Sequence, residues 1–118
     1  NARGIARIYG ALANGGEIDG IRIISKSGIE EALVEEVGNQ RDLVIGMPMR
    51  RARGFILNSE GGYGPSSRAF GHSGAGGSTG FADPETNIGV GYAMNQMQSN
   101  PAAVPRSKLL LDATYACL

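Results

Sequence analysis

The chain has 118 residues, of which 42% are hydrophobic and 19% charged, and no apolar run approaches the roughly 20 residues of a membrane-spanning helix. Eleven basic and eleven acidic residues give a formal net charge of zero, and no basic stripe favours nucleic acid or an anionic membrane surface as a partner. A single cysteine, Cys117, excludes an intrachain disulfide and a cysteine-rich metal site. These features predict one small globular domain and leave the cellular compartment open.

Residues 1–16 predict a helix. Four apolar side chains recur at the i, i+3, i+4, i+7 spacing of one helix face: Ile5, Ile8, Tyr9 and Leu12. The segment Asn14-Gly15-Gly16 supplies a stop, because glycine accepts the left-handed geometry of a C-cap. The dipeptide Asp19-Gly20 follows between isoleucines and predicts a short extended excursion or a tight hairpin.

A second helix is expected to begin at Ser27 and to end at Gly38. Ser27 and Glu30 have the spacing of a capping box, and Ile29, Leu33 and Val37 follow on one side. The acidic residues of the segment are interpreted as a solvated helix face rather than a metal site, since no histidine lies nearby: Glu30, Glu31, Glu35 and Glu36.

Extended structure is expected after residue 42. Residues 49–58, MRRARGFILN, predict one strand, residues 68–73 a second, and residues 88–95, IGVGYAMN, a third. In the third strand the large side chains alternate with small ones, Gly89, Gly91 and Ala93, and such a bare face lets another backbone come close. The expected neighbour is the last helix, which Pro105 opens.

The order helix, helix, three strands, helix predicts an α+β fold with antiparallel strands joined by short loops and helices packed on the sheet. Residues 1–118 are expected to form a single domain that is only part of a larger family domain, for the reasons given below.

The segment 70–87, FGHSGAGGSTGFADPETN, carries the candidate chemistry. Gly71-His72-Ser73-Gly74-Ala75 differs by one residue from the G-x-S-x-G turn that presents a nucleophilic serine in α/β-hydrolases, but no helix can follow it through four glycines and a proline. A phosphate-binding loop is also disfavoured, because the segment lacks G-K-[ST] and has threonine at position 79 instead of the last glycine of G-x-G-x-x-G.

The triplet His72-Ser73-Gly74 resembles the Lys-Thr-Gly motif of penicillin-recognising enzymes in the variant where histidine replaces lysine. Residues 71–97, GHSGAGGSTGFADPETNIGVGYAMNQM, resemble a strand, glycine turn and next strand of the β-lactamase-related serine hydrolases, in the branch of class C β-lactamases and penicillin-binding-protein-like esterases. Residues 2–25 resemble the helix that precedes this sheet, and residues 105–118 the C-terminal helix of the family.

The resemblance implies site roles for five residues. His72 contributes to proton transfer or hydrogen bonding, Ser73 donates to a substrate carboxylate or carbonyl, and Gly74 keeps the strand edge clear. Ala75 and Gly76 belong to the oxyanion and substrate-binding segment, where the N–H of Ala75 supplies half of an oxyanion hole. A neutral imidazole holds a carboxylate less well than lysine does, which favours ester or small-amide substrates over β-lactams.

Two further catalytic elements of that family are missing from the chain. No serine has a lysine three positions later, and no Tyr-x-Asn or Ser-x-Asn triplet occurs. The sequence is therefore expected to be the C-terminal part of a longer serine hydrolase, inactive by itself and prone to self-association through uncovered apolar surface. The alternative is a non-catalytic binding or scaffolding domain derived from the same fold. No cofactor is expected, and one histidine with scattered carboxylates gives no metal-ligand set.

Overall fold

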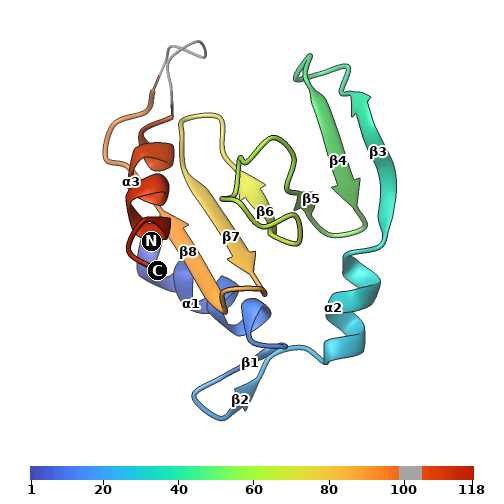
Figure 1. Cartoon of the computed structure of the whole chain (residues 1–118), viewed down its shortest axis with the longest axis vertical. Coiled ribbons are helices and arrows are strands. Elements are labelled where there is room, and N and C mark those ends of the chain that lie inside the picture. Colours follow the sequence, from blue (N-terminus) through green and yellow to red (C-terminus); the bar gives the residue numbers. More distant parts are fainter. Residues whose placement is uncertain (99–104) are drawn as a thin grey trace.

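A computed structural model describes residues 1–98 and 105–118 of the chain (Figure 1). Its helices are α1 (Ala2–Ala13), α2 (Lys26–Ala32) and α3 (Arg106–Tyr115). Its strands are β1 (Glu17–Ile18), β2 (Ile21–Arg22), β3 (Glu35–Arg41), β4 (Pro48–Ala52), β5 (Ile56–Leu57), β6 (Phe70–Ser73), β7 (Thr79–Asp83) and β8 (Ile88–Tyr92).

A six-stranded antiparallel sheet is the centre of the fold. Its strand order is β3-β4-β5-β6-β7-β8, so every strand lies beside its neighbour in sequence, while β1 and β2 form a separate hairpin. Helices pack on this sheet (Figure 1). The predicted α+β class, with antiparallel strands and packed helices, is confirmed.

Two fully buried phenylalanines mark the two faces of the sheet. Phe70 lies in a core cluster with Leu12 of α1 and Ile29 of α2. Phe81 lies in a second cluster with Tyr63 and with Leu111 of α3. Because successive side chains of a strand point to opposite faces, α1 covers one face of β7 and α3 the other. The candidate site lies on the face of Phe81.

The N-terminal predictions are confirmed. Helix α1 ends at Ala13, and Gly15 and Gly16 adopt the left-handed backbone with φ of 75° and 90°. The hairpin turns at Asp19 and Gly20, which have φ of 53° and 75° as a two-residue turn requires.

The second helix differs from its prediction at both ends. Its N-cap is Ser25, whose Oγ accepts a hydrogen bond from the Gly28 N–H at 3.0 Å, so the capping box at Ser27 is wrong. The helix ends at Ala32 instead of Gly38. The cause is tertiary, because residues 35–41 gain a strand partner in β4.

Two of the predicted acidic helix residues therefore lie on β3 and pair with arginines of the next hairpin. Glu35 accepts hydrogen bonds from Arg50 at 3.1 and 2.7 Å, and Glu36 accepts one from Arg53 at 2.6 Å. All these side chains are partly exposed, so each pair contributes little to stability.

The predicted strand over residues 49–58 is two strands. Ala52 N–H donates to the Phe55 carbonyl at 2.8 Å and closes a tight turn between β4 and β5. The third predicted strand ends at Tyr92 instead of Asn95. The three expected strands are thus six in the main sheet, because the first of them is divided into β4 and β5, and because β3 and β7 were not predicted.

The small face of β8 meets α1, so the expected contact with the last helix is wrong. A Cβ atom added to Gly89 would overlap the backbone of Gly10, and one added to Gly91 would overlap the Ala2 carbonyl and the Ala6 nitrogen. The row continues across the sheet, because Gly80 pairs with Gly91 and lies against Tyr9. Ala93 lies beyond the strand and is exposed.

Replacing Gly91 with valine should therefore destabilise the protein by about 1–3 kcal/mol, because the branched side chain forces α1 away from β8. The midpoint of urea denaturation measures this effect. Gly38→Ala is the matched control: it is also a strand glycine, but its Cβ meets only the Glu35 carboxylate at 3.5 Å. Equal midpoints for the two variants would contradict the close packing of α1.

Helix α3 is fastened to the end of β7 by a buried carboxylate. The hydroxyl of Tyr115 donates to Asp83 Oδ2 at 2.7 Å, and the Glu85 N–H donates to Oδ1 at 3.0 Å. Burial of the fully buried Asp83 raises the pKa of its carboxyl, but hydrogen bonds from Tyr115, Thr86, Glu85 and Ser66 outweigh burial and hold that pKa below its ordinary value.

Tyr115→Phe should lower the urea midpoint at pH 7, and the difference from the parent protein should narrow as the pH falls. A depressed pKa contributes stability above the unfolded value, near 3.9, that is lost as Asp83 protonates. Without the Tyr115 hydroxyl, the ionised Asp83 carboxylate contributes less to the free energy of unfolding at pH 7, so less stability is lost when Asp83 is protonated. Tyr92→Phe is the control, and a Tyr115→Phe deficit that stays constant from pH 7 to pH 2.5 would contradict the linkage.

Candidate functional site

Strand β6 brings His72 and Ser73 to an unpaired stretch of strand edge. On one side His72 pairs with Gly80 and Ser73 with Thr79 of β7. On the other side the ladder with β5 covers only Phe70 and Gly71. The edge beside His72 and Ser73 therefore has no strand partner within the described residues.

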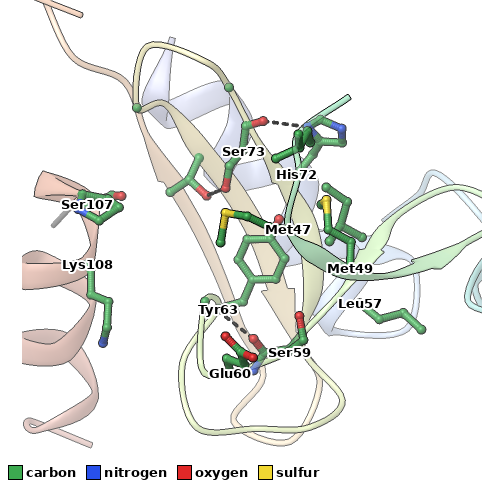
Figure 2. Close-up of a pocket in the computed structure, with 18 of the residues that line it drawn as sticks. Met47, Met49, Leu57, Ser59, Glu60, Tyr63, His72, Ser73, Ser107 and Lys108 are labelled. Atoms are coloured by element: carbon green, nitrogen blue, oxygen red, sulfur yellow. Dashed lines mark hydrogen bonds between the residues drawn. The ribbon is translucent and has the colours of Figure 1, made fainter. Parts of the chain in front are cut away.

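This edge opens on a cleft of about 410 Å³ (Figure 2). Its walls come from the β3–β4 hairpin, the loop after β5, the end of β6 and the start of α3. Figure 2 shows Ser107 and Lys108 on the opposite side of the cleft from His72 and Met49. A cleft of this size accommodates a small-molecule substrate.

Three hydroxyl groups meet at the floor of the cleft. Ser73 Oγ lies 3.0 Å from Thr79 Oγ1 on the neighbouring strand. Burial raises the pKa of the Tyr63 phenol, and a hydrogen bond with the Ser73 side chain only partly offsets this. Tyr63 thus stays protonated at neutral pH.

Tyr63 is held in place from two sides. Its ring stacks on Phe81 with centroids 5.4 Å apart and 19° between the ring planes. The buried Asn58 side chain accepts from the Tyr63 N–H at 2.9 Å and donates to the carbonyls of Gly64 and Ser66, both at 2.8 Å. Asn58 therefore organises the loop that aims Tyr63 at Ser73.

The His72 ring is exposed, and its Nδ1 lies 2.9 Å from the Ser73 carbonyl oxygen. A carbonyl oxygen only accepts, so this contact requires the proton on Nδ1. In the neutral imidazole the other nitrogen, Nε2, is then the proton acceptor. The geometry equips His72 to accept a proton or a hydrogen bond at Nε2.

The structure separates the five predicted site residues into two groups. His72, Ser73 and Gly74 line the cleft, whereas Ala75 and Gly76 form the turn that follows and are not among the lining residues. Ala75 is exposed, and its N–H donates to no residue that the structure describes. Gly76 is buried against Met94 and Met97, where a Cβ atom would lie 2.9 and 2.8 Å from them.

Sequence reasoning missed the residues that support Ser73. Tyr63 and Asn58 lie in and beside the segment GGYGPSS, whose composition indicates only a turn-rich loop. Thr79 follows the glycine turn and faces Ser73 only because of the β6–β7 register. An aromatic residue inside a glycine-rich loop was the one local signal available for Tyr63.

Two general features of the described residues bear on the kind of site. None of their helices has the length and apolar character to cross a membrane. Residues 1–98 and 105–118 also bring together no group of three or more His, Cys, Asp or Glu side chains suited to a metal ion.

Comparison with known proteins gives consistent relatives. A curated protein, the esterase/beta-lactamase LipL of Mycobacterium tuberculosis (strain ATCC 25618 / H37Rv), is 39% identical over 99 residues, which are 83% of this chain and 22% of LipL. A family VIII carboxylesterase of known crystal structure is 57% identical, with a TM-score of 0.93 over the whole chain and 32% of the carboxylesterase. A penicillin-binding protein homologue from Caulobacter crescentus is 42% identical, with a TM-score of 0.92 and the same coverage.

The chain thus spans about a third or less of the length of these relatives. The family model described as Beta-lactamase matches residues 1–115, nearly the whole sequence. The resemblance inferred from the His72-Ser73-Gly74 region is confirmed at the level of the family. With its sheet, its helices and its esterase relatives in agreement, this chain belongs to the beta-lactamase family in its esterase-like branch.

Proposed function

We propose that the chain is the C-terminal part of a serine acyl hydrolase that cleaves esters or small amides through an acyl-enzyme. The observation that carries the proposal is the unpaired edge of β6, which presents His72 and Ser73 to a substrate-sized cleft. His72-Ser73-Gly74 is the counterpart of Lys-Thr-Gly in this assignment. The esterase relatives support the reaction class.

The nucleophilic serine lies outside these residues in this proposal, since the chain has no Ser-x-x-Lys. That serine attacks the substrate carbonyl, and its proton passes to the departing alcohol or amine as the carbon–oxygen or carbon–nitrogen bond breaks. Water then attacks the acyl-enzyme, releasing the acid and restoring the serine. The chain spans about a third of its solved relatives, which is consistent with a division of the active site between two stretches of sequence.

The residues of this chain bind and orient the substrate. Ser73, whose Oγ lies 3.0 Å from Thr79 Oγ1, donates its proton to a substrate oxygen. His72 accepts a hydrogen bond or a proton at Nε2. The N–H of Ala75, which donates to no described residue, serves as one donor of the oxyanion hole once the remaining part of the active site lies over the turn. One such donor contributes about 3–4 kcal/mol to transition-state stabilisation.

The isolated chain should not hydrolyse p-nitrophenyl acetate faster than buffer, because covalent catalysis needs the missing nucleophile. Initial rates with and without the purified chain measure this. Ser73→Ala is the matched control: turnover by the parent chain that Ser73→Ala abolishes would make Ser73 itself the nucleophile and overturn the proposal. Sequencing the coding region upstream of Asn1 tests the same proposal directly, because it should encode a Ser-x-x-Lys motif.

In the longer protein, His72→Ala should lower kcat/KM for esters by roughly 10²-fold, the usual scale for losing an acid–base or equivalent hydrogen-bonding group. The melting temperature should shift little, because the ring is exposed. His72→Lys should shift preference toward substrates that bear a carboxylate, since it adds a permanent cation. Near-normal turnover of His72→Ala with a much lower melting temperature would show a structural histidine instead.

A further inference from the structure

One wall of the cleft is apolar, and it comes mostly from the β3–β4 hairpin. Ile45, Met47, Pro48 and Met49 line the cleft from the hairpin, and Leu57 of β5 continues the surface. These five residues are called the apolar wall below. Ile45 and Met47 are 54% and 58% exposed, so their side chains are available for contact with a bound molecule.

The loop that carries Ile45 and Met47 is organised by Asp42. Its Oδ1 accepts from the N–H groups of Val44 and Ile45, each at 2.9 Å. Its own N–H donates to the Met47 carbonyl at 2.9 Å, and its carbonyl accepts from the Gly46 N–H at 2.8 Å. The apolar wall is therefore pre-formed, which lowers the entropic cost of binding a ligand against it.

The permanent cations at the cleft are paired with carboxylates. Arg51 donates to Asp42 Oδ2 at 2.7 Å. Lys108 on the opposite wall donates to both oxygens of Asp112, at 2.6 and 2.9 Å. Glu60 also lines the cleft and forms no ion pair within residues 1–98 and 105–118. These charges favour a neutral ligand over an anionic one.

We propose that the apolar wall binds an aliphatic group of a neutral ester, so that the protein prefers esters with an extended hydrocarbon chain. This inference rests on the proposed function, because it places the scissile carbonyl beside His72 and Ser73 in the same cleft. The occupant is the acyl chain or the alcohol chain of the ester, and two substrate series distinguish these sources.

The apolar wall predicts that kcat/KM rises with the length of the hydrocarbon chain of the ester. Each methylene fully removed from water contributes a factor of about four in kcat/KM, and partial burial contributes less. From acetate to hexanoate the parent protein should therefore gain at least about tenfold. An equal rate for all chain lengths, in both series, would overturn the proposal.

The hairpin itself offers a matched control. Leu43 and Val44 stand on the same loop, are 96% and 95% exposed, and do not line the cleft. The longer protein is prepared as Ile45→Thr/Met47→Gln and as Leu43→Gln/Val44→Thr, two pairs with similar changes of size and polarity. Steady-state kinetics are measured with p-nitrophenyl acetate, butyrate and hexanoate, and with methyl, butyl and hexyl acetates.

The Ile45→Thr/Met47→Gln protein should lose most of the preference for long chains, so that its ratio of long-chain to short-chain kcat/KM falls about tenfold. The same ratio in the Leu43→Gln/Val44→Thr protein should stay within about twofold of the parent. If the chain-length preference is lost only among the p-nitrophenyl esters, the apolar wall binds the acyl chain. If it is lost only among the alkyl acetates, the apolar wall binds the alcohol chain.

Two further results would overturn the inference, and a third would contradict the function on which it rests. Equal effects of both pairs would make the hairpin tip a protein or lipid contact rather than a substrate wall. An unchanged chain-length ratio in Ile45→Thr/Met47→Gln, checked with Met47→Gln alone if the pair does not fold, would place the aliphatic group elsewhere. Activity of the parent on no ester at all would instead contradict the proposed function on which the inference rests.

Discussion

The close packing of α1 on a row of glycines in β7 and β8 is the constraint on which the rest of the structure depends. Gly80, Gly89 and Gly91 leave no room for side chains beneath the helix, so its backbone approaches the strands directly. The large side chains of β7 and β8 consequently go to the other face, where Phe81 stacks with Tyr63 and α3 packs. Because the small residues face α1, the large side chains lie on the opposite face of the sheet, and the cleft forms on that face.

The strand register then places the chemical groups. Cross-strand partners share a face of the sheet. Ser73 pairs with Thr79, and Thr79 pairs with Tyr92, so these three side chains lie in one row on the face that α3 covers. His72 begins on the opposite face, and its ring reaches the cleft at the unpaired edge of β6. A shift of one residue would exchange these faces and remove both Ser73 and Thr79 from the cleft. The β6–β7 hairpin therefore serves the site through its register as much as through its residues.

The sequence correctly predicted those elements that depend on interactions between residues close together in the chain. The helix at residues 2–13, the Asp19-Gly20 hairpin and the strand at residues 88–92 follow from periodicity and turn chemistry. The failures arose where tertiary pairing prevails: residues 35–41 carry helix-compatible glutamates but join β4, and the short β5 has too few residues to show alternation. In the site, the triplet at 72–74 was identifiable from its residues, whereas Tyr63 and Asn58 act through a loop whose shape only the fold determines.

The residues assigned to substrate orientation are held more firmly in this structure than the residues assigned to stabilising charge in the reaction. The groups proposed to orient a substrate are held by neutral hydrogen bonds and packing: Asn58 holds the loop, Phe81 packs on the Tyr63 ring, and Thr79 Oγ1 lies beside Ser73 Oγ. These contacts involve no ionised partner, so the orientation of the Ser73 hydroxyl is insensitive to pH across the neutral range. The groups assigned to charge development, His72 and the N–H of Ala75, are instead exposed and loosely partnered. Their electrostatic strength depends on exclusion of water, because a donor in a low-dielectric site acts more strongly than one in solvent. The proposed upstream part of the enzyme therefore has two tasks at this surface: to supply the nucleophile and to cover the turn at residues 74–77.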